Sequence, residues 1–583
     1  MKDSLLKKNW IKKQLDPRLI LNISQKYSLP NISSTLLSTR FKKISEIKNF
    51  LKPTLDFYLP NPSIFNDMEK GGNRILDAIK NKEKIAILGD YDVDGLSSIV
   101  LLREYFKFFN IEVFSYIPDR ITEGYGPNKK AIDKIKSEKT SLLIMLDCGT
   151  NSHDIISYVF KNKIDLIIID HHKSNEKHSD ELILINPNTI FDNSKYNFVC
   201  TAGLVFIFLF FIQKLIKKIN LSKKIPNLTN YLDLVALATV CDVVPLIDIN
   251  RTFVFQGLKI LSKRSNLGLK VLADEGQLNK KPDEEDLGFF FGPRINAGGR
   301  IGIANIGEQL LISNDEKHAE KLVKQLNTLN YQRKLIEDKV FEEALEKIYK
   351  EKKNKYKSLF IFRKDWHEGV LGIVASRLKE KFNKPVIILT RNKKIFKGSC
   401  RSILGIDIGL LILKAKQKKI IVNGGGHQMA AGLSINEENL NLFQTFFEEY
   451  VKENKSHNNK SFFFDETISL NAINDELIDS INNIAPYGLG NPKPKFLFTN
   501  LKIIKPNLVG ETKKHLSFFI TDGIKTIKAI IFYAMDSSLG NSILSNYNKT
   551  LFSFIGSVKR SLWKNKVYFE TIIEDVIIEK DII

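Results

Sequence analysis

Three short apolar runs that end in acidic residues constrain the fold of this chain more than any other feature. The runs are "KIAILG" before Asp90, "SLLIML" before Asp147, and "LIIID", which ends at Asp170 and is followed by His171 and His172. Stretches with a helical spacing of apolar residues, such as "LSSIVLLREYFKFF", lie between the runs. Buried strands that alternate with helices predict a parallel α/β sheet. Because the carboxyl ends of parallel strands meet at one edge, we expect these acids and histidines to lie together.

Two further segments bring acids to the same edge of the predicted sheet. "GDYDVDG" adds Asp92 and Asp94 after the first run, and the apolar helical segment "NYLDLVALATVC" is followed by Asp242. Acids that alternate along an extended segment point the same way, so Asp90, Asp92 and Asp94 are expected on one face. Carboxylates this close repel one another, and a cation has to neutralise them.

The residue types at this edge indicate which cation it holds. Carboxylates combined with imidazoles suit Mn²⁺ or Mg²⁺. The set is too large for a single ion, which predicts two ions bridged by a shared carboxylate. Two metal ions about 3.5–4 Å apart activate a water and hold the leaving oxygen during attack on phosphorus. The sequence therefore predicts a two-metal site for phosphate-ester chemistry.

Several of these residues are also compatible with different roles. "DYDVDG" begins like an EF-hand calcium loop, but the twelfth position, which needs Glu, is Leu101. Acids after strands also cap helices, which accounts for one or two of them. For His172 the alternative is a histidine satisfied within the core. The chain has no G-x-x-x-x-G-K-[ST] motif, so no nucleotide cofactor is predicted.

Composition restricts the class of protein less sharply. The net charge of +22 favours an anionic partner such as nucleic acid or a membrane surface, but an Asn-, Ile- and Lys-rich composition explains it equally well. The four cysteines lack C-x-x-C spacing, which excludes the usual thiolate zinc site and fits a reducing cytoplasm. The N-terminal sequence has no apolar region of the kind found in secretory signals. The most apolar segment, residues 198–212, is shorter than the roughly 18–20 residues that cross a bilayer, so we expect a buried helix and no membrane partner.

A chain of 583 residues is too long to fold around a single hydrophobic core. Changes in the pattern of apolar and polar residues indicate where it divides into domains. Apolar residues at helical spacing predict one long helix over about residues 315–352. A polar linker at 453–461 precedes about six strand-like runs, typical of a small barrel or sandwich. The expected domains are a basic N-terminal segment (1–80), a catalytic α/β domain (81–306), a connecting helix (307–352), a second α/β domain (353–452) and an all-β domain (462–583).

The order of these motifs resembles the DHH phosphoesterase superfamily. "GDYDVDG", "LDCGT", "DHH" and "LDLVALATVCDVVPL" are similar to its four motifs, and "NGGGHQMAAG" to the glycine-rich motif of the associated DHHA1 domain. "IPDRITEGYG", "GPRINAGGR", "WHEGVLGIVASRL", "KGSCRS" and "APYGLGNPKPKF" resemble the RecJ family of single-strand-specific 5′→3′ exonucleases. The resemblance implies a two-lobed DHH/DHHA1 core, with parallel-type sheets joined by a long helix, and a C-terminal all-β OB-type domain.

The resemblance also implies roles for matched positions at the metal site. One metal would be held by Asp94, Asp147, His171 and Asp242, and the other by Asp92 with Asp147. Many relatives have a histidine where this chain has Leu88, so Asp90 would partly replace it and the site that it serves would fill only with substrate. The catalytic set is His172 beside the scissile phosphate, Asp170 as the group that orients a ring, and Asp90.

A second set of matched positions is implied to bind the substrate. This set is Arg120, Arg300, Ser399, Arg401, Gly425, Gly426 and His427. Glycine has no Cβ, so a phosphate can approach the backbone closely, and arginine holds phosphate with two hydrogen bonds. For each arginine alone, a surface salt bridge is the alternative. In the OB-type domain at most a third of the available aromatic residues are expected to contact bases: Phe518, Phe519, Phe532, Tyr533, Trp563 and Tyr568.

The resulting prediction is a cytoplasmic, metal-dependent exonuclease that hydrolyses single-stranded DNA from the 5′ end. It releases 5′-mononucleotides and acts in DNA recombination and repair, with single-stranded DNA as its partner and a helicase and a single-strand-binding protein as further candidates. One alternative is a DHH-type nanoRNase or small phosphoesterase, against which the C-terminal β domain argues. The other is a non-catalytic DNA-binding replication scaffold, against which the intact acid set argues.

Overall fold

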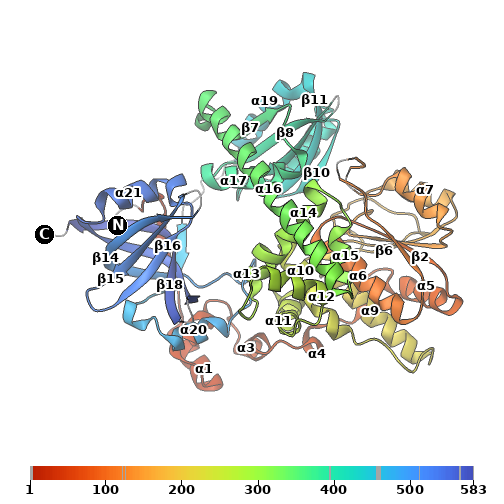
Figure 1. Ribbon diagram of the computed structural model, residues 1–583, viewed down its shortest axis with the longest axis horizontal. Helices are drawn as coiled ribbons and strands as arrows, with labels where there is room; N and C mark the ends of the chain where they lie inside the picture. Colours follow the sequence, from red (N-terminus) through yellow and green to blue (C-terminus); the bar gives the residue numbers. More distant parts are fainter. Residues whose placement is uncertain are drawn as a thin grey trace. The chain divides into compact units, whose positions relative to one another are not determined.

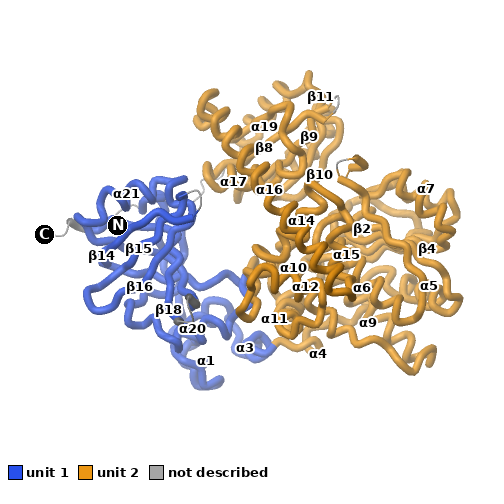
Figure 2. Tube along the Cα trace, viewed as in Figure 1, with its two compact units in different colours: residues 1–52, 456–487, 491–583 blue, residues 53–455, 488–490 orange. Residues whose placement is uncertain are grey.

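The computed structural model describes residues 4–120, 122–124, 126–392, 395–454, 461–510, 513–563 and 566–581. The chain forms two compact units (Figure 2). Unit 1 consists of residues 1–52, 456–487 and 491–583, and unit 2 of residues 53–455 and 488–490. All residues predicted for the metal site and the phosphate site lie in unit 2.

The first lobe of unit 2 is built on a parallel sheet (Figure 1). Its five strands stand in the order β3-β2-β4-β5-β6, and every neighbouring pair is parallel. The strands are β2 (Ile85–Gly89), β3 (Val113–Tyr116), β4 (Leu142–Leu146), β5 (Asp165–Ile169) and β6 (Ile183–Ile185). The chain passes from β2 to β3 on one side and returns to β4 on the other, so the strand order reverses beside β2. Ligands of open α/β sheets bind at such reversals, outside the carboxyl ends of the strands.

Helices cover both faces of this sheet, which explains the unbroken apolar runs. Ile85 and Ile87 of β2 face one hydrophobic cluster, and Ala86 and Leu88 face another. The helices against the first face include α5 (Met68–Asn81), α6 (Val93–Phe108), α9 (Thr201–Lys218) and α10 (Leu232–Cys241). Those against the second are α7 (Lys129–Ser137) and α8 (His153–Lys161). Leu88 therefore packs against α7 and α8, in the core.

Further helices complete the lobe and lead to the next one. They are α4 (Leu55–Tyr58), α11 (Asp248–Ser262), α12 (Leu267–Glu275), α13 (Glu284–Asp286), α14 (Gly292–Ile301), α15 (Ile306–Ile312) and α16 (Glu316–Lys350). The long helix predicted over about 315–352 is confirmed as α16. The apolar segment 198–212 lies within the buried helix α9. Among the described residues, no helix is long and apolar enough to cross a membrane.

The second lobe contains a five-stranded sheet in the order β10-β11-β9-β8-β7. Its elements are β7 (Leu359–Arg363), α17 (Leu371–Phe382), β8 (Val386–Asn392), β9 (Ile395–Arg401), α18 (Ile408–Gln417), β10 (Asn423–His427), β11 (Ala430–Asn436) and α19 (Leu440–Asn454). Only β7 and β8 run parallel, and the other pairs are antiparallel. The expectation of parallel-type sheets thus holds for the first lobe and is wrong here, because β9 pairs antiparallel with both β8 and β11, and β11 pairs antiparallel with β10.

Unit 1 contains the all-β domain expected at the C-terminus. The strands pair in the order β13-β14-β15-β16-β18-β17, and an additional pairing of β14 with β17 closes a barrel. The elements are β12 (Ser461–Phe464), β13 (Glu466–Thr467), α20 (Asp475–Asn482), β14 (Phe496–Val509), β15 (His515–Thr521), β16 (Thr526–Ile531), α21 (Ser538–Asn546), β17 (Thr550–Trp563) and β18 (Lys566–Asp581). The fold class predicted from the sequence is confirmed in this respect.

The N-terminal residues belong to the same unit as this barrel. Strand β1 (Asn9–Lys12) pairs in parallel with β12. Helices α1 (Pro17–Tyr27), α2 (Asn31–Ser38) and α3 (Ile44–Leu51) contribute Ile23, Leu36, Leu37, Ile47 and Phe50 to the core that α20 and the barrel share. The first 52 residues are therefore part of a folded unit, although they are more than 400 positions from the barrel in sequence.

Candidate functional site

The turn after β2 separates the three acids that the sequence places on one face. Strand β2 ends at Gly89, and α6 begins at Val93 with Asp92 as its N-terminal cap. One carboxylate oxygen of Asp92 accepts hydrogen bonds from the backbone N–H groups of Asp94 (3.0 Å) and Gly95 (3.2 Å). The predicted extended segment is therefore wrong, because capping by Asp92 starts a helix and carries Asp94 around its first turn.

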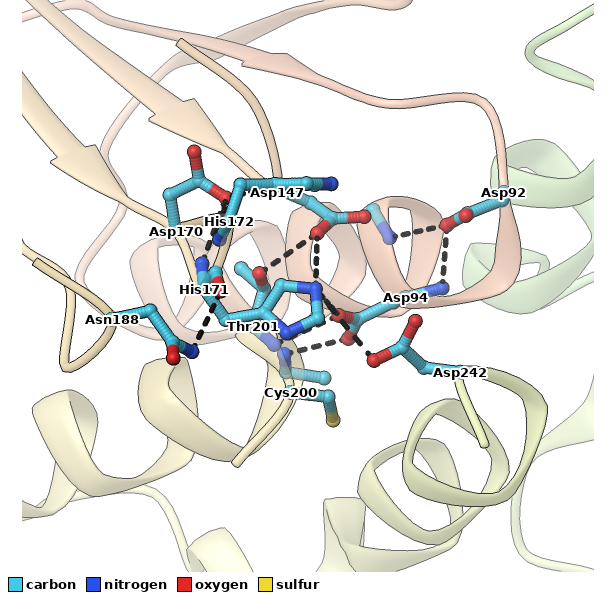
Figure 3. Close-up of polar contacts among 12 residues, drawn as sticks. Asp92, Asp94, Asp147, Asp170, His171, His172, Asn188, Cys200, Thr201 and Asp242 are labelled. Carbon is cyan, nitrogen blue, oxygen red and sulfur yellow. Dashed lines mark hydrogen bonds and ion pairs between the residues drawn. The ribbon is translucent and has the colours of Figure 1, made fainter. Parts of the chain in front are cut away.

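The separated acids join two different clusters at the carboxyl edge of the sheet (Figure 3). Ligand atoms of Asp90, Asp92 and Asp147 lie within 4.8 Å of one another. The same holds for Asp94, His171 and Asp242, and for Asp147 with the two histidines. The structure thus brings together all eight residues predicted for the metal and catalytic sets, with Asp147 shared: Asp90, Asp92, Asp94, Asp147, Asp170, His171, His172 and Asp242.

His171 lies at the centre of the second cluster. Its Nε2 atom is 3.3 Å from Asp147 Oδ1, 3.6 Å from Asp242 Oδ2 and 3.9 Å from Asp94 Oδ2. Burial acts to lower the pKa of His171, but Asp242 and Asp147 outweigh it and raise that pKa well above its usual value. A protonated imidazole therefore supplies positive charge among these acids when no metal ion does.

The carboxylates of both clusters carry the electrostatic signature of a cation site. Burial, followed by neighbouring acids, raises the pKa of Asp147 and Asp90 well above the usual range. Burial also raises the pKa of Asp94, and that of Asp242 to about 7. The Oδ2 atom of Asp242 is buried and accepts no hydrogen bond within the described chain. These oxygen and imidazole donors fit Mn²⁺ or Mg²⁺, whose charge would keep the carboxylates ionised.

Local backbone strain accompanies the shared ligand. Asp147 follows β4 directly and has φ +59°, a conformation uncommon for residues other than glycine. Its N–H donates to the carbonyl of Ile169 at 3.1 Å, which fixes it beside β5. Strain of this kind persists where the surrounding structure over-determines a functional residue.

Asp170 contacts the second histidine rather than the metal clusters. Its Oδ1 atom is 2.7 Å from Nδ1 of His172 and accepts the backbone N–H of His171 at 2.7 Å. Its other oxygen accepts the hydroxyl of Thr150 at 2.6 Å. Burial opposes ionisation, yet His172 keeps the pKa of Asp170 below its usual range. In turn Asp170 outweighs burial and raises the pKa of His172 to about 10.

Four of the five substrate-binding residues predicted in the second lobe share one face of its sheet, and Gly426, opposite Ala431, faces the other side. Ser399 and Gly425 both stand opposite Gly432 of β11, and Arg401 and His427 both stand opposite Ala430. Residues directly opposite in a ladder, and residues two apart on a strand, point to the same side. The side chains of Ser399, Arg401 and His427 therefore line the same side of the sheet.

This face combines fixed donors with open space. Nη1 of Arg401 donates to Ser399 Oγ and its Nε to Ser376 Oγ, both at 3.1 Å. A Cβ atom at Gly425 would meet nothing within 4 Å, whereas at Gly426 it would lie 2.4 Å from the carbonyl oxygen of Ala430. Gly425 thus leaves room for a ligand, and Gly426 permits close packing of the hairpin.

The two lobes of unit 2 meet at this point. The rings of His172 and His427 are stacked with centroids 6.3 Å apart. Arg120 lies over the ring of Tyr91 at 5.2 Å, and Nη1 of Arg300 donates to the carbonyl of Gly369 in the second lobe at 3.3 Å. Burial, followed by Arg120, lowers the pKa of Arg300 to about 10. Within the described parts of the chain, Arg120, Arg300 and Arg401 form no ion pair with a carboxylate, so a surface salt bridge does not account for them.

Two residues that hold the metal-site acids in place were not predicted for this role: Thr201, within the apolar segment 198–212, and Asn296, within "GPRINAGGR". The N–H groups of Thr201 and Ala202, at the start of α9, donate to the two oxygens of Asp94, each at 2.8 Å. The hydroxyl of Thr201 donates to Asp147 Oδ1 at 2.9 Å. Asn296 of α14 accepts the N–H of Val93 at 3.0 Å and so holds the turn between Asp92 and Asp94. A polar residue at the start of the most apolar helix was the only signal for Thr201.

Family models match each part of this architecture. The DHH family N-terminal domain covers residues 84–239, the DHHA1 domain residues 353–453 and the RecJ OB domain residues 464–575. An acid and histidine cluster at the carboxyl edge of a parallel sheet, followed by a DHHA1 lobe, defines a phosphoesterase of the DHH class.

Named relatives indicate which family of DHH phosphoesterases this chain belongs to. A single-stranded-DNA-specific exonuclease RecJ of Haemophilus influenzae is 32% identical, over 84% of this chain and 88% of the relative. That of Escherichia coli is 31% identical, over 78% of this chain and 81% of the relative. The crystal structure of RecJ from Thermus thermophilus in complex with Mn²⁺ has the same fold, with a TM-score of 0.80 at 23% identity over 98% of this chain and 79% of that chain. The chain belongs to the RecJ family.

Proposed function

We propose that this chain is a metal-dependent exonuclease that hydrolyses single-stranded DNA. The observation that carries the proposal is the pair of neighbouring clusters at the carboxyl edge of the parallel sheet, Asp90, Asp92 and Asp147 in one and Asp94, His171 and Asp242 in the other. Asp147 links them, since its Oδ1 lies 3.3 Å from Nε2 of His171. Relatives that align over most of their length are named single-stranded-DNA-specific exonucleases, and solved RecJ structures are described with Mn²⁺ and with Mg²⁺. The OB domain distinguishes the chain from small two-lobed phosphoesterases, and the complete acid set from a non-catalytic scaffold.

The roles of the clustered residues follow from their donor atoms. Asp94, His171 and Asp242 would hold one metal ion, and Asp90 and Asp92 the other, with Asp147 shared between them. Bound ions would lower the pKa of a water and neutralise charge on the phosphate. Asp90 fills the place for which the sequence supplies no histidine, since Leu88 lies in the core.

His172 faces the second lobe, where its ring is stacked with that of His427. We assign it as the group that donates a proton to the leaving oxygen. Asp170 accepts from Nδ1, which leaves Nε2 as a proton donor, and the raised pKa of His172 keeps it protonated at neutral pH. A positioned general acid of this kind contributes about 10²–10⁴-fold to a rate. Cleavage with this arrangement releases 5′-mononucleotides.

The second lobe supports a preference for the 5′ end. Ser399, Arg401 and His427 line one face of their sheet, close to the ring of His172. Guanidinium groups without a carboxylate partner bind terminal phosphate strongly, and Arg120 and Arg300 add to the positive potential there. A terminal phosphate held one nucleotide from the metal clusters restricts cutting to that end.

Further assignments rest on the same function. We place the enzyme in DNA recombination and repair in the cytoplasm, which four free cysteines suit, with a helicase and a single-strand-binding protein as partners that supply and cover its substrate. The division into five segments at 81, 307, 353 and 462 is retained as a functional division: catalytic domain, connecting helix, DHHA1 domain and OB domain after the N-terminal segment.

One nuclease assay tests the proposal. Single strands labelled at either the 5′ or the 3′ end are incubated with Mn²⁺ or with a chelator. The expected result is labelled mononucleotide from the 5′ label at once, delayed loss of the 3′ label, and no cleavage with chelator. Asp147→Ala should abolish activity, while Asp154→Ala, at an exposed position of α8, should not. Activity that survives in Asp147→Ala contradicts the two-metal site, and preference for two- to five-nucleotide RNA favours the nanoRNase alternative.

A further inference from the structure

Thr201 contacts two metal-site acids through different groups (Figure 3). It is the first residue of α9 and is fully buried. Its N–H donates to Asp94 Oδ2 at 2.8 Å, and its hydroxyl donates to Asp147 Oδ1 at 2.9 Å. Asp94 lies in the first turn of α6 and Asp147 directly after β4, so one residue from a third element, α9, joins them.

Ordinary helix capping explains only part of this arrangement. The cap residue Cys200 makes no side-chain capping bond, and Asp94 takes over by accepting the N–H groups of Thr201 and Ala202. Any residue type except proline supplies those N–H groups, so capping requires no hydroxyl at position 201. Two other buried threonines within helices of the lobe, Thr239 and Thr252, donate to the carbonyl four residues earlier. Thr201 instead donates to a carboxylate.

The bond to Asp147 has a consequence for the shared ligand. The carboxylate of Asp147 can turn about its Cβ–Cγ bond, and a hydroxyl that donates to one oxygen restricts that rotation. Oδ1 is thereby held toward Nε2 of His171, at 3.3 Å. The remaining lone pairs of the carboxylate stay available for the cluster with Asp90 and Asp92. Loss of a group that orients a metal ligand in this way typically costs about 10–100-fold in metal affinity or activity.

The position of Thr201 is itself fixed by the burial of its helix. Thirteen residues of α9 are buried, and they include the largest apolar run of the chain. Gly203 has no space for a side chain, since a Cβ there would lie 2.7 Å from Val199. A helix anchored along most of its length cannot shift its first turn, so the donors of Thr201 and Ala202 stay in place.

We propose that Thr201 is a positioning residue, which sets the orientation of the Asp147 carboxylate so that it serves both metal clusters. The proposal rests on the metal-dependent function proposed above. It concerns the hydroxyl alone, because the backbone N–H bonds to Asp94 survive substitution. The hydroxyl therefore contributes to metal affinity and to turnover, beyond any contribution to stability.

Variants of the full chain separate this role from a structural one. Thr201→Val removes the hydroxyl at nearly constant volume, Thr201→Ser keeps it, and Thr252→Val removes a buried hydroxyl bond in α11 as a matched control. Mn²⁺ binding is measured from the electron paramagnetic resonance signal of free Mn²⁺, and thermal unfolding is followed without metal. Thr201→Val should bind Mn²⁺ about 10–100-fold more weakly and show lower kcat. Thr201→Ser and Thr252→Val should bind it as the unchanged chain does.

Two results overturn the proposal. One is unchanged Mn²⁺ affinity in a folded Thr201→Val protein. If Thr201→Val does not fold, the second variant decides: weaker Mn²⁺ binding by a folded Thr201→Ser protein, which retains the hydroxyl, overturns the proposal. Failure of the proposed function looks different, because the unchanged chain would then bind Mn²⁺ without degrading single-stranded DNA.

Discussion

Asp170 holds the ring of His172 from behind, with Oδ1 2.7 Å from Nδ1, while the ring faces His427 of the second lobe. This contact gives the two adjacent histidines different surroundings. His171 lies among Asp94, Asp147 and Asp242, whereas His172 is tied to an acid outside the metal clusters. These contacts support the proposal that His171 binds metal and His172 faces the substrate.

This division predicts separable effects of two substitutions. His171→Ala removes an imidazole from the metal cluster and should weaken Mn²⁺ binding about 10–100-fold or more. His172→Ala leaves every carboxylate of the clusters in place, so Mn²⁺ should still bind while kcat falls about 10²–10⁴-fold. Titration calorimetry with Mn²⁺, combined with steady-state kinetics, distinguishes the two. Loss of Mn²⁺ binding in both variants would contradict the division.

Removal of the Asp170 charge should change the pH dependence. Asp170 raises the pKa of His172 to about 10. His172 is therefore protonated below that pH, and activity that needs its proton is lost as the pH rises through this pKa. In Asp170→Asn the pKa of His172 falls, and the alkaline limb of kcat/KM should move to lower pH. A profile of kcat/KM against pH between 6 and 10 measures this shift. An alkaline limb at the same pH in both proteins would show that it belongs to another group.

Metal binding itself should release protons. Without metal, His171 is protonated because its pKa is raised, and the pKa of Asp242 is about 7. Both must lose their protons to become ligands, so Mn²⁺ affinity should rise from pH 6 to pH 8. Calorimetry in two buffers of different ionisation enthalpy counts the protons released at each pH. Affinity independent of pH would contradict the assignment of His171 as a ligand.

The edge cluster could be predicted from the sequence because its signal is local: an apolar run followed at once by an acid marks the end of a buried strand. The separation of Asp92 from Asp94 could not, since it depends on where a helix begins, and that is decided by the cap bond of Asp92 itself. Thr201 contacts Asp147 and Asp94, which are 54 and 107 positions away in the sequence, so no local pattern marks these contacts. The packing of residues 1–52 with the barrel is hidden for the same reason.

Recognition of the 5′ phosphate should depend on Arg401. Arg401→Ala removes a guanidinium that Ser399 and Ser376 hold in place, and KM for 5′-phosphorylated strands should rise roughly 10–100-fold, as for loss of a charged hydrogen bond. Strands with a 5′-hydroxyl should be affected far less. Arg391→Ala is a matched control, since Arg391 lies on neighbouring β8 and pairs with Glu437. An equal rise in KM for both kinds of strand would show that Arg401 does not recognise the 5′ phosphate.

The aromatic residues of the OB domain should divide into core and contact groups. Phe518 is 1% exposed and belongs to the barrel core, whereas Phe532 and Tyr533 are 48% and 53% exposed and flank His515. The side chain of Trp563, another candidate, lies outside the described residues. Base stacking contributes about 1–3 kcal/mol per base, so Phe532→Ala and Tyr533→Ala should each weaken single-strand binding without lowering stability.

Phe518→Ala is the matching control for these exposed positions. It removes a buried ring and should lower the free energy of unfolding by about 3–5 kcal/mol, with its effect on DNA binding following from unfolding. Fluorescence anisotropy with a labelled single strand, together with urea unfolding, separates the two outcomes. A small phosphodiester needs only the metal site and no contact with the barrel, so its hydrolysis should be unchanged in Phe532→Ala. Unaltered strand binding in the Phe532→Ala, Tyr533→Ala double variant would exclude this face of the barrel from the DNA path.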